Sequence, residues 1–445
     1  MNTPIYDFVK AYASAAPTRF HMPGHKGRGP LGCEELDLTE IPGADSLYEA
    51  SGIIAESEAN ASRLFGCPTY YSTEGSSHCI RAMVFLAMQD ARRQGRSPRI
   101  LAARNVHRTF LTAAALLRAE VCWLWDESPT YLSANPTPDS VEQGILSEGP
   151  TAVYLTCPDY LGHLPDLRPI AEVCHAHGAL LLVDNAHGAY LRFLPRSRHP
   201  MDLGADLCCD SAHKTFPVLT GGAWLHLSPD AKPELRASVR DALALFGSTS
   251  PSYLILQSLD LCNPWLEALP EIMPAFLESV DALKAGLRAE GWSLYGEEPW
   301  KITLRAKARG LTGTALAALL EQKNIYAEFS DPDFVTLMMT PQNPERDFIR
   351  LREALRSVSA RPPLPETPVP TGKPEQVCSL AEAMLAPCVR VPASESLGRV
   401  LARPGVSCPP AVPIRMPGER IDEAALAAFH HYGIHSCEIL TTGGM

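Results

Sequence analysis

The amino-acid sequence predicts an α/β protein built on a mostly parallel sheet with helices on both faces. Between residues 50 and 230, short apolar runs alternate with amphipathic helical segments. Each run is bounded by turn or charged residues, as expected for buried strands. Strands that are apolar throughout favour a parallel sheet covered on both sides. At roughly 150 residues per domain, the 445 residues allow two or three domains.

The elements of the large sheet follow one another in a regular order. Helical periodicity predicts helices over 56–64, 80–93 and 170–177. Continuous apolar runs predict strands over 100–103, 121–125, 152–156, 180–183 and 205–209. Ligands of such sheets bind at the carboxyl ends of the strands. The residues that follow the apolar runs are therefore the first candidates for a functional site.

From about residue 265 the order of elements changes. Helices are expected over 273–288, 313–322 and 344–358, with strands over 301–305 and 335–339, which indicates a smaller α+β domain. Clustered prolines then predict a linker, because they remove amide donors and favour extended chain. The predicted organisation is an N-terminal segment (1–50), a large domain (51–262), a small domain (263–360), a proline-rich linker (361–376) and a C-terminal domain (377–445).

Composition excludes several classes of protein. With 39 basic and 50 acidic residues the net charge is −11, whereas a general nucleic-acid binder needs a basic face. No run approaches the roughly 20 apolar residues that span a bilayer, and the N-terminus lacks a signal-peptide pattern. Thirteen irregularly spaced cysteines fit free thiols in a reducing compartment. We therefore expect a cytoplasmic protein without membrane or nucleic-acid partners.

One group of residues near the C-terminus has the side chains of a metal site. The segment HHYGIHSC contains His430, His431, His435 and Cys437. No closed set of ligands follows it, so the polar end of a helix and its turn is the preferred interpretation. The sequence therefore predicts no metal.

Two residues at predicted strand ends point to chemistry. Asp184 follows the strand 180–183, where a carboxylate needs a cationic partner, although capping of the next turn is a common alternative. Lys214 follows the strand 205–209 and precedes Gly221 and Gly222. A desolvated lysine amine can form an imine, although a surface lysine is the alternative. One strand–helix–strand step separates the two residues, which suits pyridoxal 5′-phosphate (PLP), with Lys214 on the aldehyde and Asp184 on the ring nitrogen.

Two further segments could complete such a site. A predicted apolar-periodic helix is preceded by Gly75, Ser76 and Ser77. The two serine hydroxyls and the free amides at the start of the helix could bind an anion. The alternative is that a serine is an ordinary N-cap. His107 follows the strand 100–103, where an imidazole can stack on a cofactor ring or be an ordinary polar residue.

The order of these segments resembles the PLP-dependent Orn/Lys/Arg decarboxylases of bacterial type. The matching motifs are FHMPGHKGRG (20–29), RNVHRTF, DNAHGAY, SAHKTFPVLT, STSPSY (248–253) and PPAVPIRMPGERI (409–421). The resemblance implies the type I PLP-dependent transferase fold, also called the aspartate-aminotransferase fold, in a short member without an N-terminal wing domain. The implied activity is decarboxylation of arginine, lysine or ornithine to agmatine, cadaverine or putrescine.

The resemblance also implies a role for individual residues. Lys214 would form the Schiff base, Asp184 would pair with the pyridinium, and His107 and Ala186 would pack on opposite faces of the ring. The implied phosphate ligands are Ser76, Ser77, Ser211 and His213. His213, beside the lysine, is also a candidate proton donor. Thr249 would reach the phosphate of a partner subunit, so that a homodimer is the smallest active unit.

A basic substrate needs an anion for its distal end. The candidates are Glu40 and Asp45 in the segment DLTEIPGAD and Glu419 in MPGERI. Each could instead be a solvated loop carboxylate. The sequence does not choose among arginine, lysine and ornithine.

Two departures from the family pattern lie in the segments expected to form the site. EGSSHCI stands where NGSTSGN is usual, which introduces Glu74, His78 and Cys79, and DNAHGAY replaces DEAHGAH, with Asn185 and Tyr190. These changes leave two alternatives open. One is another type I activity, such as an aminotransferase. The other is an inactive homologue that regulates an active partner.

Overall fold

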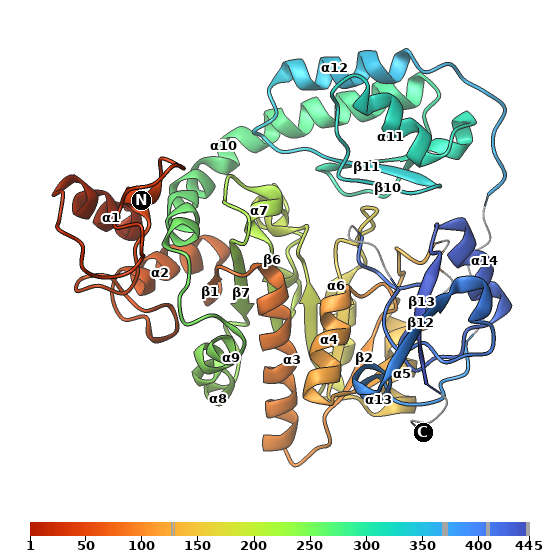
Figure 1. Cartoon of the computed structure of the whole chain (residues 1–445), viewed down its shortest axis with the longest axis horizontal. Coiled ribbons are helices and arrows are strands. Elements are labelled where there is room, and N and C mark those ends of the chain that lie inside the picture. The colour runs from red at the N-terminus through yellow and green to blue at the C-terminus, as the bar shows by residue number, and fades with distance from the viewer. Residues whose placement is uncertain (126–127, 129, 367–372, 406–409, 442–445) are drawn as a thin grey trace. The chain divides into compact units, whose positions relative to one another are not determined.

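The computed structural model describes residues 1–125, 128, 130–366, 373–405 and 410–441. Figure 1 shows the fold and labels many of the helices and strands. Part of the predicted linker 361–376, and Pro409 of the last motif, lie outside the described residues. Among the described residues, no helix combines the length and the apolar character needed to cross a membrane.

The largest sheet confirms the predicted α/β class. Its seven strands lie in the order β1–β7–β6–β5–β4–β2–β3. The pairs β5–β6 and β2–β3 are parallel, whereas β7 pairs antiparallel with both β6 and β1. The strands are β1 (Thr69–Ser72), β2 (Arg99–Ala102), β3 (Glu120–Trp123), β4 (Ala152–Thr156), β5 (Leu180–Asp184), β6 (Leu207–Asp210) and β7 (Ala223–Leu227).

Two strands of this sheet, β1 and β7, were not predicted. β1 contains buried polar residues, Thr69 and Ser72, so it lacks a continuous apolar run. β7 follows the glycine pair at 221 and 222, which obscures its start. The strands that were predicted occur within three residues of the expected bounds. The apolar runs of most of them are buried, whereas Val121, Cys122 and Trp123 of β3 are only half-buried.

Helices accompany these strands along the chain. They are α1 (Pro4–Ser14), α2 (Ile53–Phe65), α3 (Gly75–Arg93), α4 (Arg108–Leu117), α5 (Pro138–Glu148), α6 (Leu167–Ala176), α7 (Ala212–Thr215), α8 (Pro233–Ala237) and α9 (Val239–Phe246). Short 3-10 helices are η1 (Glu34–Leu36), η2 (Leu47–Glu49), η3 (Ala189–Phe193), η4 (Pro200–Leu203), η5 (Ala306–Arg309) and η6 (Ala393–Glu395).

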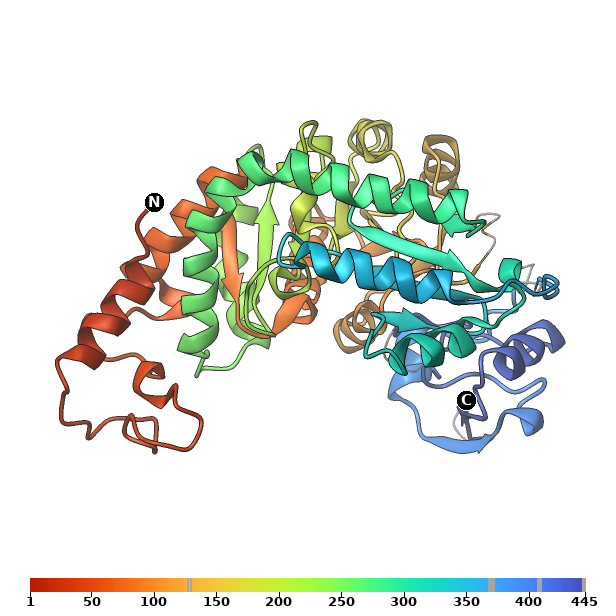
Figure 2. The same cartoon turned by 90° about the horizontal axis from the view of Figure 1, so that it is seen from above.

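The chain forms two compact units. The first contains residues 1–97, 151–153 and 167–273, and the second contains 98–150, 154–166 and 274–445. Helix α10 (Tyr253–Ala289) is a single helix of 37 residues (Figures 1 and 2). The sequence predicted only its second half, from residue 273, because Pro264, Pro270 and Pro274 lie inside it and proline usually ends a helix.

The second unit contains a four-stranded sheet in the order β10–β11–β9–β8. Its strands are β8 (Leu294–Tyr295), β9 (Lys301–Arg305), β10 (Phe329–Ser330) and β11 (Phe334–Met338), accompanied by α11 (Gly313–Glu321) and α12 (Glu345–Arg356). The C-terminal part of this unit pairs β12 (Cys388–Pro392) with β13 (Ser436–Leu440) and adds α13 (Leu380–Leu385) and α14 (Glu423–His431).

Candidate functional site

Lys214 lies in the short helix α7, directly after strand β6. Its Nζ is 2.9 Å from Nε2 of His187, which is buried. The neighbouring His213 donates from Nδ1 to the carbonyl oxygen of Gly222, at 2.9 Å. The lysine amine therefore has an imidazole as an immediate neighbour. Sequence reasoning missed His187, although it lies in the motif DNAHGAY only three positions after Asp184.

Asp184 is the last residue of β5 and is 3% exposed. Its Oδ1 accepts the backbone N–H of Ala186 at 3.2 Å and lies 3.7 Å from the Sγ of Cys209. In the parallel register of β5 and β6, Asp184 is opposite Cys209. Asp184 and Lys214 therefore come from the carboxyl ends of adjacent strands, as the strand–helix–strand spacing predicts.

Ser76 and Ser211 lie together at the start of helix α3. The hydroxyl of Ser211 donates to Oγ of Ser76 at 2.8 Å. Gly75, with a φ of +71°, is the first residue of α3, and Ser77 lies in the same first turn. The first-turn amides and hydroxyls of a helix form an anion site. This arrangement is suited to a phosphate group.

Gly221 connects the segment after Lys214 to the start of α3. Its carbonyl oxygen accepts the N–H of Gly75 at 2.7 Å. Its φ is +103°, and a Cβ there would lie 2.8 Å from the carbonyl oxygen of Thr73. Only glycine combines this backbone conformation with so close an approach.

The unusual residues of the EGSSHCI segment have defined partners. His78 is buried, accepts from the hydroxyl of Ser72 at 2.8 Å and donates to the carbonyl of Leu243 at 2.7 Å. Burial lowers the pKa of His78, which keeps its imidazole neutral. Glu74 is exposed, and its carboxylate accepts the N–H of Ser248 at 2.5 Å. Burial raises the pKa of the Cys79 thiol, so it stays protonated.

The candidate substrate anions in the N-terminal segment differ in their surroundings. Asp45 is 8% exposed and accepts N–H groups along the chain that enters α2. Its donors are the backbone amides of Ser46, Ser51, Gly52, Ile54 and Ala55. Glu40 is exposed and accepts the hydroxyl of Thr39 at 2.5 Å. Asp45 therefore has the contacts of a structural cap, whereas Glu40 faces solvent.

Glu419 forms a buried ion pair in the second unit. Arg104 donates to its two oxygens at 2.6 and 2.9 Å, and Met416 N–H donates at 2.9 Å. Glu419 is 1% exposed, and the guanidinium of Arg104 lies 4.2 Å from the ring centroid of Trp125. These contacts fasten the MPGERI segment to the loop after β2.

His107 and Thr249 lie at the ends of helices. His107 is the N-cap of α4, and its Nδ1 accepts the N–H of Thr109 at 3.2 Å. Thr249 is exposed in the segment between α9 and α10, beside Ser248. The capping contact uses one nitrogen of His107 and is compatible with a ring that stacks.

The His- and Cys-containing tail lies at the end of α14, its turn and β13. Nε2 of His431 is 3.1 Å from Oδ1 of Asp333, and the hydroxyl of Tyr432 donates to Oδ2 of Asp333 at 2.8 Å. A closer group of metal-ligand side chains occurs elsewhere, at His199, Cys208 and Asp210, all of them buried.

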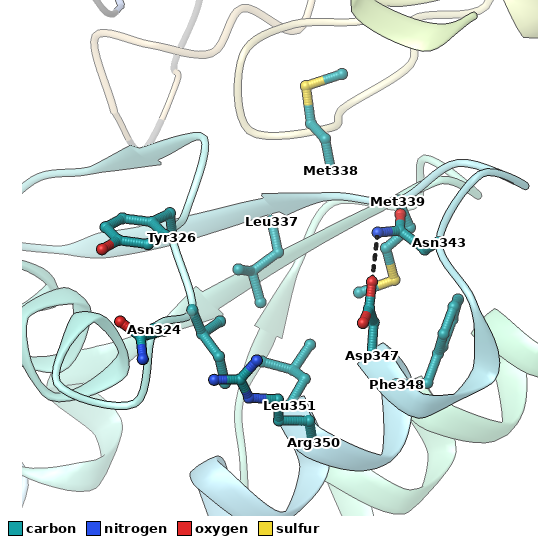
Figure 3. Close-up of a pocket in the computed structure, with 11 residues that line it drawn as sticks. Asn324, Tyr326, Leu337, Met338, Met339, Asn343, Asp347, Phe348, Arg350 and Leu351 are labelled. Atoms are coloured by element: carbon teal, nitrogen blue, oxygen red, sulfur yellow. Dashed lines mark hydrogen bonds between the residues drawn. The ribbon is translucent and has the colours of Figure 1, made fainter. Parts of the chain in front are cut away.

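A pocket of about 330 Å³ lies in the second unit between β11 and α12 (Figure 3). Asn343 donates to Asp347 at 3.4 Å, and the apolar part of the lining includes Met338, Met339 and Phe348. Its described lining includes no residue of the predicted site. It is therefore not the place where Lys214 chemistry occurs.

The donor set around Lys214 fits PLP. The buried carboxylate of Asp184 suits a protonated ring nitrogen, and the amine of Lys214 suits an aldehyde. The hydroxyls of Ser76 and Ser211, at the first turn of a 19-residue helix, suit a phosphate. The close packing at Gly221 holds the segment after Lys214 against the segment that leads into α3.

Comparison with protein families finds one match over most of the chain. Residues 3–271 match the family described as "Orn/Lys/Arg decarboxylase, major domain". The chain is 30% identical to the "Uncharacterized protein YaaO" of Bacillus subtilis, over 96% of this chain and 93% of that protein. It is also 30% identical to an arginine decarboxylase of Bacillus subtilis, over 95% of this chain and 91% of that protein.

Solved structures share the fold. The chain is similar to lysine decarboxylase A from Pseudomonas aeruginosa, with a TM-score of 0.81 and 16% sequence identity. The similarity covers 98% of this chain and 80% of that one. This likeness confirms the predicted type I fold.

Proposed function

The chain belongs to the Orn/Lys/Arg decarboxylase family, and from that premise we propose that it decarboxylates arginine to agmatine. Membership makes it a PLP-dependent carboxy-lyase that acts on a basic amino acid. Four relatives that are named arginine decarboxylases, 29–30% identical over more than 90% of each chain, support arginine over lysine or ornithine.

We assign the predicted residues as follows. Lys214 holds the aldehyde end of PLP, and Asp184 keeps the ring nitrogen protonated. Ser76, Ser77, Ser211 and His213 hold the phosphate, and His107 and Ala186 pack on the ring. When bound, PLP provides the electron sink for the charge left as carbon dioxide departs.

The observation that supports this assignment best is the contact between Lys214 Nζ and His187 Nε2, at 2.9 Å. A lysine must lose a proton to act as a nucleophile, and a neutral imidazole nitrogen at hydrogen-bond distance can accept it. His213 donates its Nδ1 proton to the carbonyl of Gly222, and we keep it as the candidate proton donor beside the lysine.

The substrate anion is the remaining assignment. Glu40 is the exposed candidate and accepts from the Thr39 hydroxyl, whereas Asp45 and Glu419 are buried and accept several hydrogen bonds each. We propose Glu40 first for the distal guanidinium of arginine. Glu40→Gln should raise KM for arginine more than it lowers kcat, because the contact is made before and during reaction.

We further propose a cytoplasmic homodimer. The N-terminal segment exposes large apolar side chains, with Phe20 93% and Leu31 83% exposed, which supports burial against a second copy. Thr249 is exposed, as a residue that reaches into a partner must be. Light scattering on the purified protein, at concentrations near 1 μM and 50 μM, tests the dimer, and a monomer at both would contradict it.

The decisive experiment is a substrate screen with purified enzyme and PLP. Arginine, lysine and ornithine are supplied separately, and carbon dioxide and amine are measured. We expect agmatine and carbon dioxide in equal amounts from arginine, and none from Lys214→Ala. Lys232→Ala, which removes an exposed lysine that pairs with the buried Asp90, is the matched control and should retain activity. Faster turnover of lysine or ornithine would contradict the arginine assignment. Turnover that requires a keto acid and releases no carbon dioxide would contradict decarboxylation.

A further inference from the structure

A buried group of ionisable side chains lies beside the strand ends that supply Asp184 and Lys214. Asp210, the last residue of β6, is fully buried, as are His199 and His226. Oδ2 of Asp210 is 3.0 Å from Nε2 of His199 and 3.0 Å from Nε2 of His226. A carboxylate in such surroundings stays ionised only beside a compensating cation.

The hydrogen bonds around His226 determine its protonation. Its Nδ1 lies 2.9 Å from the hydroxyl oxygen of Thr69, and that hydroxyl donates its own proton to the carbonyl of Cys67, at 3.0 Å. With the hydroxyl proton on the Cys67 carbonyl, the Thr69 oxygen is an acceptor for the ring. Because Nε2 faces the carboxylate of Asp210, both ring nitrogens of His226 donate, and the ring is an imidazolium.

The directions of the pKa shifts of His226 and Asp210 agree with a charged pair. Burial alone would lower the pKa of His226, but the charge of Asp210 outweighs burial and raises it. Burial alone would raise the pKa of Asp210, but the charge of His226 and the hydrogen bonds from both histidines lower it instead. Phe65 covers the His226 ring, with centroids 4.5 Å apart, and helps to exclude water from the pair.

The same group could hold a metal only if His199 offered a lone pair. Nδ1 of His199 accepts the N–H of Met201 at 3.4 Å, so its proton is on Nε2 and points at Asp210. Cys208 Sγ lies 3.9 Å from Oδ1 of Asp210 and donates to it. All these contacts are hydrogen bonds, and His199 supplies no free ligand atom. The group is therefore an ion pair with a second, neutral histidine.

Asp210 extends this pair to the residue beside Asp184. Its Oδ1 accepts the side-chain N–H of Asn185 at 2.6 Å, and the backbone N–H of Asn185 donates to the carbonyl of Cys209 at 3.0 Å. Asn185 follows Asp184, and Ser211 follows Asp210. The pair thus joins the turn after β5 to the turn after β6.

We propose that Asp210 and His226 form a permanent buried ion pair that, through Asn185, positions Asp184 for the ring nitrogen of PLP. This role deepens the proposed function and rests on it. These are positioning residues, since the structure places none of them against the reacting atoms. The positive His226 also keeps Asp210 from adding an uncompensated negative charge beside Asp184. The departure from DEAHGAH to DNAHGAY supplies the amide donor that this arrangement uses.

The ion pair is tested on the wild-type holoenzyme without any measurement of activity. Nitrogen-15 spectra of histidine side chains distinguish imidazolium from the neutral tautomers. Nitrogen and ring-proton signals of His226, assigned by their loss in His226→Gln, should be those of an imidazolium from pH 6 to pH 9. A neutral ring, or one that titrates in this range, would overturn the pair. The groups that face it are Asp210, His199, Cys208 and Cys67.

The positioning role is tested by the affinity for PLP. His226→Gln and Asp210→Asn should each weaken PLP binding by roughly tenfold. This is the smaller effect expected when a residue that orients a binding side chain is removed. They should also shift the absorbance of the bound cofactor, because Asp184 moves relative to the ring. His175→Gln is the matched control, since His175 pairs with Asp206 at the same 3.0 Å but at the surface.

The two hypotheses fail in different ways. Folded variants with unchanged PLP affinity and spectrum would overturn the positioning role even if the enzyme is a decarboxylase. Failure of the wild-type protein to bind PLP would overturn the proposed function, while the histidine spectra would still decide the ion pair. A metal site would replace the ion pair if the purified protein contained one equivalent of zinc and the His226 signals were not those of an imidazolium.

Discussion

Replacement of Glu419 by glutamine separates a structural role for this residue from a role in substrate binding. The carboxylate is 1% exposed, and the side chain of Arg104 is 17% exposed. Glutamine keeps the size but removes the charge, which leaves the Arg104 guanidinium mostly buried without its counter-ion. Removal of one partner of a buried pair costs about 3–5 kcal/mol, whereas an exposed pair contributes at most about 1 kcal/mol.

The assay is thermal and urea unfolding of Glu419→Gln, Arg104→Met and the double variant. We expect each single variant to lose about 3–5 kcal/mol, a fall in Tm of about 10 °C for a unit of this size. The double variant should regain part of that loss, because neither charge is then left alone. Glu438→Gln, which breaks the exposed pair with Arg390 in the same unit, should cost under about 1 kcal/mol.

A Glu419→Gln protein of unchanged stability would refute this reasoning. If its KM for arginine also rose at least tenfold, Glu419 would replace Glu40 as the proposed substrate anion. If both stability and KM were unchanged, neither role would hold.

Three further changes test other parts of the structure. His187→Gln should lower kcat by about tenfold or more at unchanged Tm, because it replaces the imidazole next to Lys214 Nζ. Steady-state kinetics measure kcat and calorimetry measures Tm. Full activity would contradict a role in proton transfer. His78→Ala removes a buried ring and its bonds to Ser72 and the Leu243 carbonyl, and should cost about 2–4 kcal/mol in urea unfolding; a loss below 1 kcal/mol would show that the ring does not anchor α3. Burial raises the pKa of Asp331 to about 7, so the folded state binds a proton more tightly than the unfolded state and the free energy of unfolding should fall between about pH 4 and pH 7. Asp331→Asn should flatten that fall in urea unfolding at pH 5 and pH 8, and an unchanged slope would contradict the assignment.

The strands and most helices of the large sheet are predictable from local pattern. The segments 152–156 and 301–305 occur at the predicted bounds. The first is a continuous apolar run up to Thr156, and the second, KITLR, alternates apolar and polar residues. β1 is different, since its buried Thr69 and Ser72 are polar, and the Thr69 hydroxyl obtains its partner His226 from far along the chain. A distant hydrogen-bond partner cannot be identified from the sequence around the strand. The length of α10 is unpredictable for the same reason, because packing along its whole length retains a helix that its prolines would otherwise end.

The amino-acid sequence by itself determined the fold class, the family, and the placement of Asp184 and Lys214 at neighbouring strand ends. These properties follow from short-range periodicity and from motifs that are contiguous in the chain. Only the tertiary structure decided which side chains meet: His187 with Lys214, Asp45 with the amides that enter α2, Glu419 with Arg104, and Asp210 with His226. The energy of a carboxylate or an imidazole depends on charges and donors within a few ångströms. Folding brings those neighbours from distant parts of the chain, so the protonation and role of each group become visible only once the chain has folded.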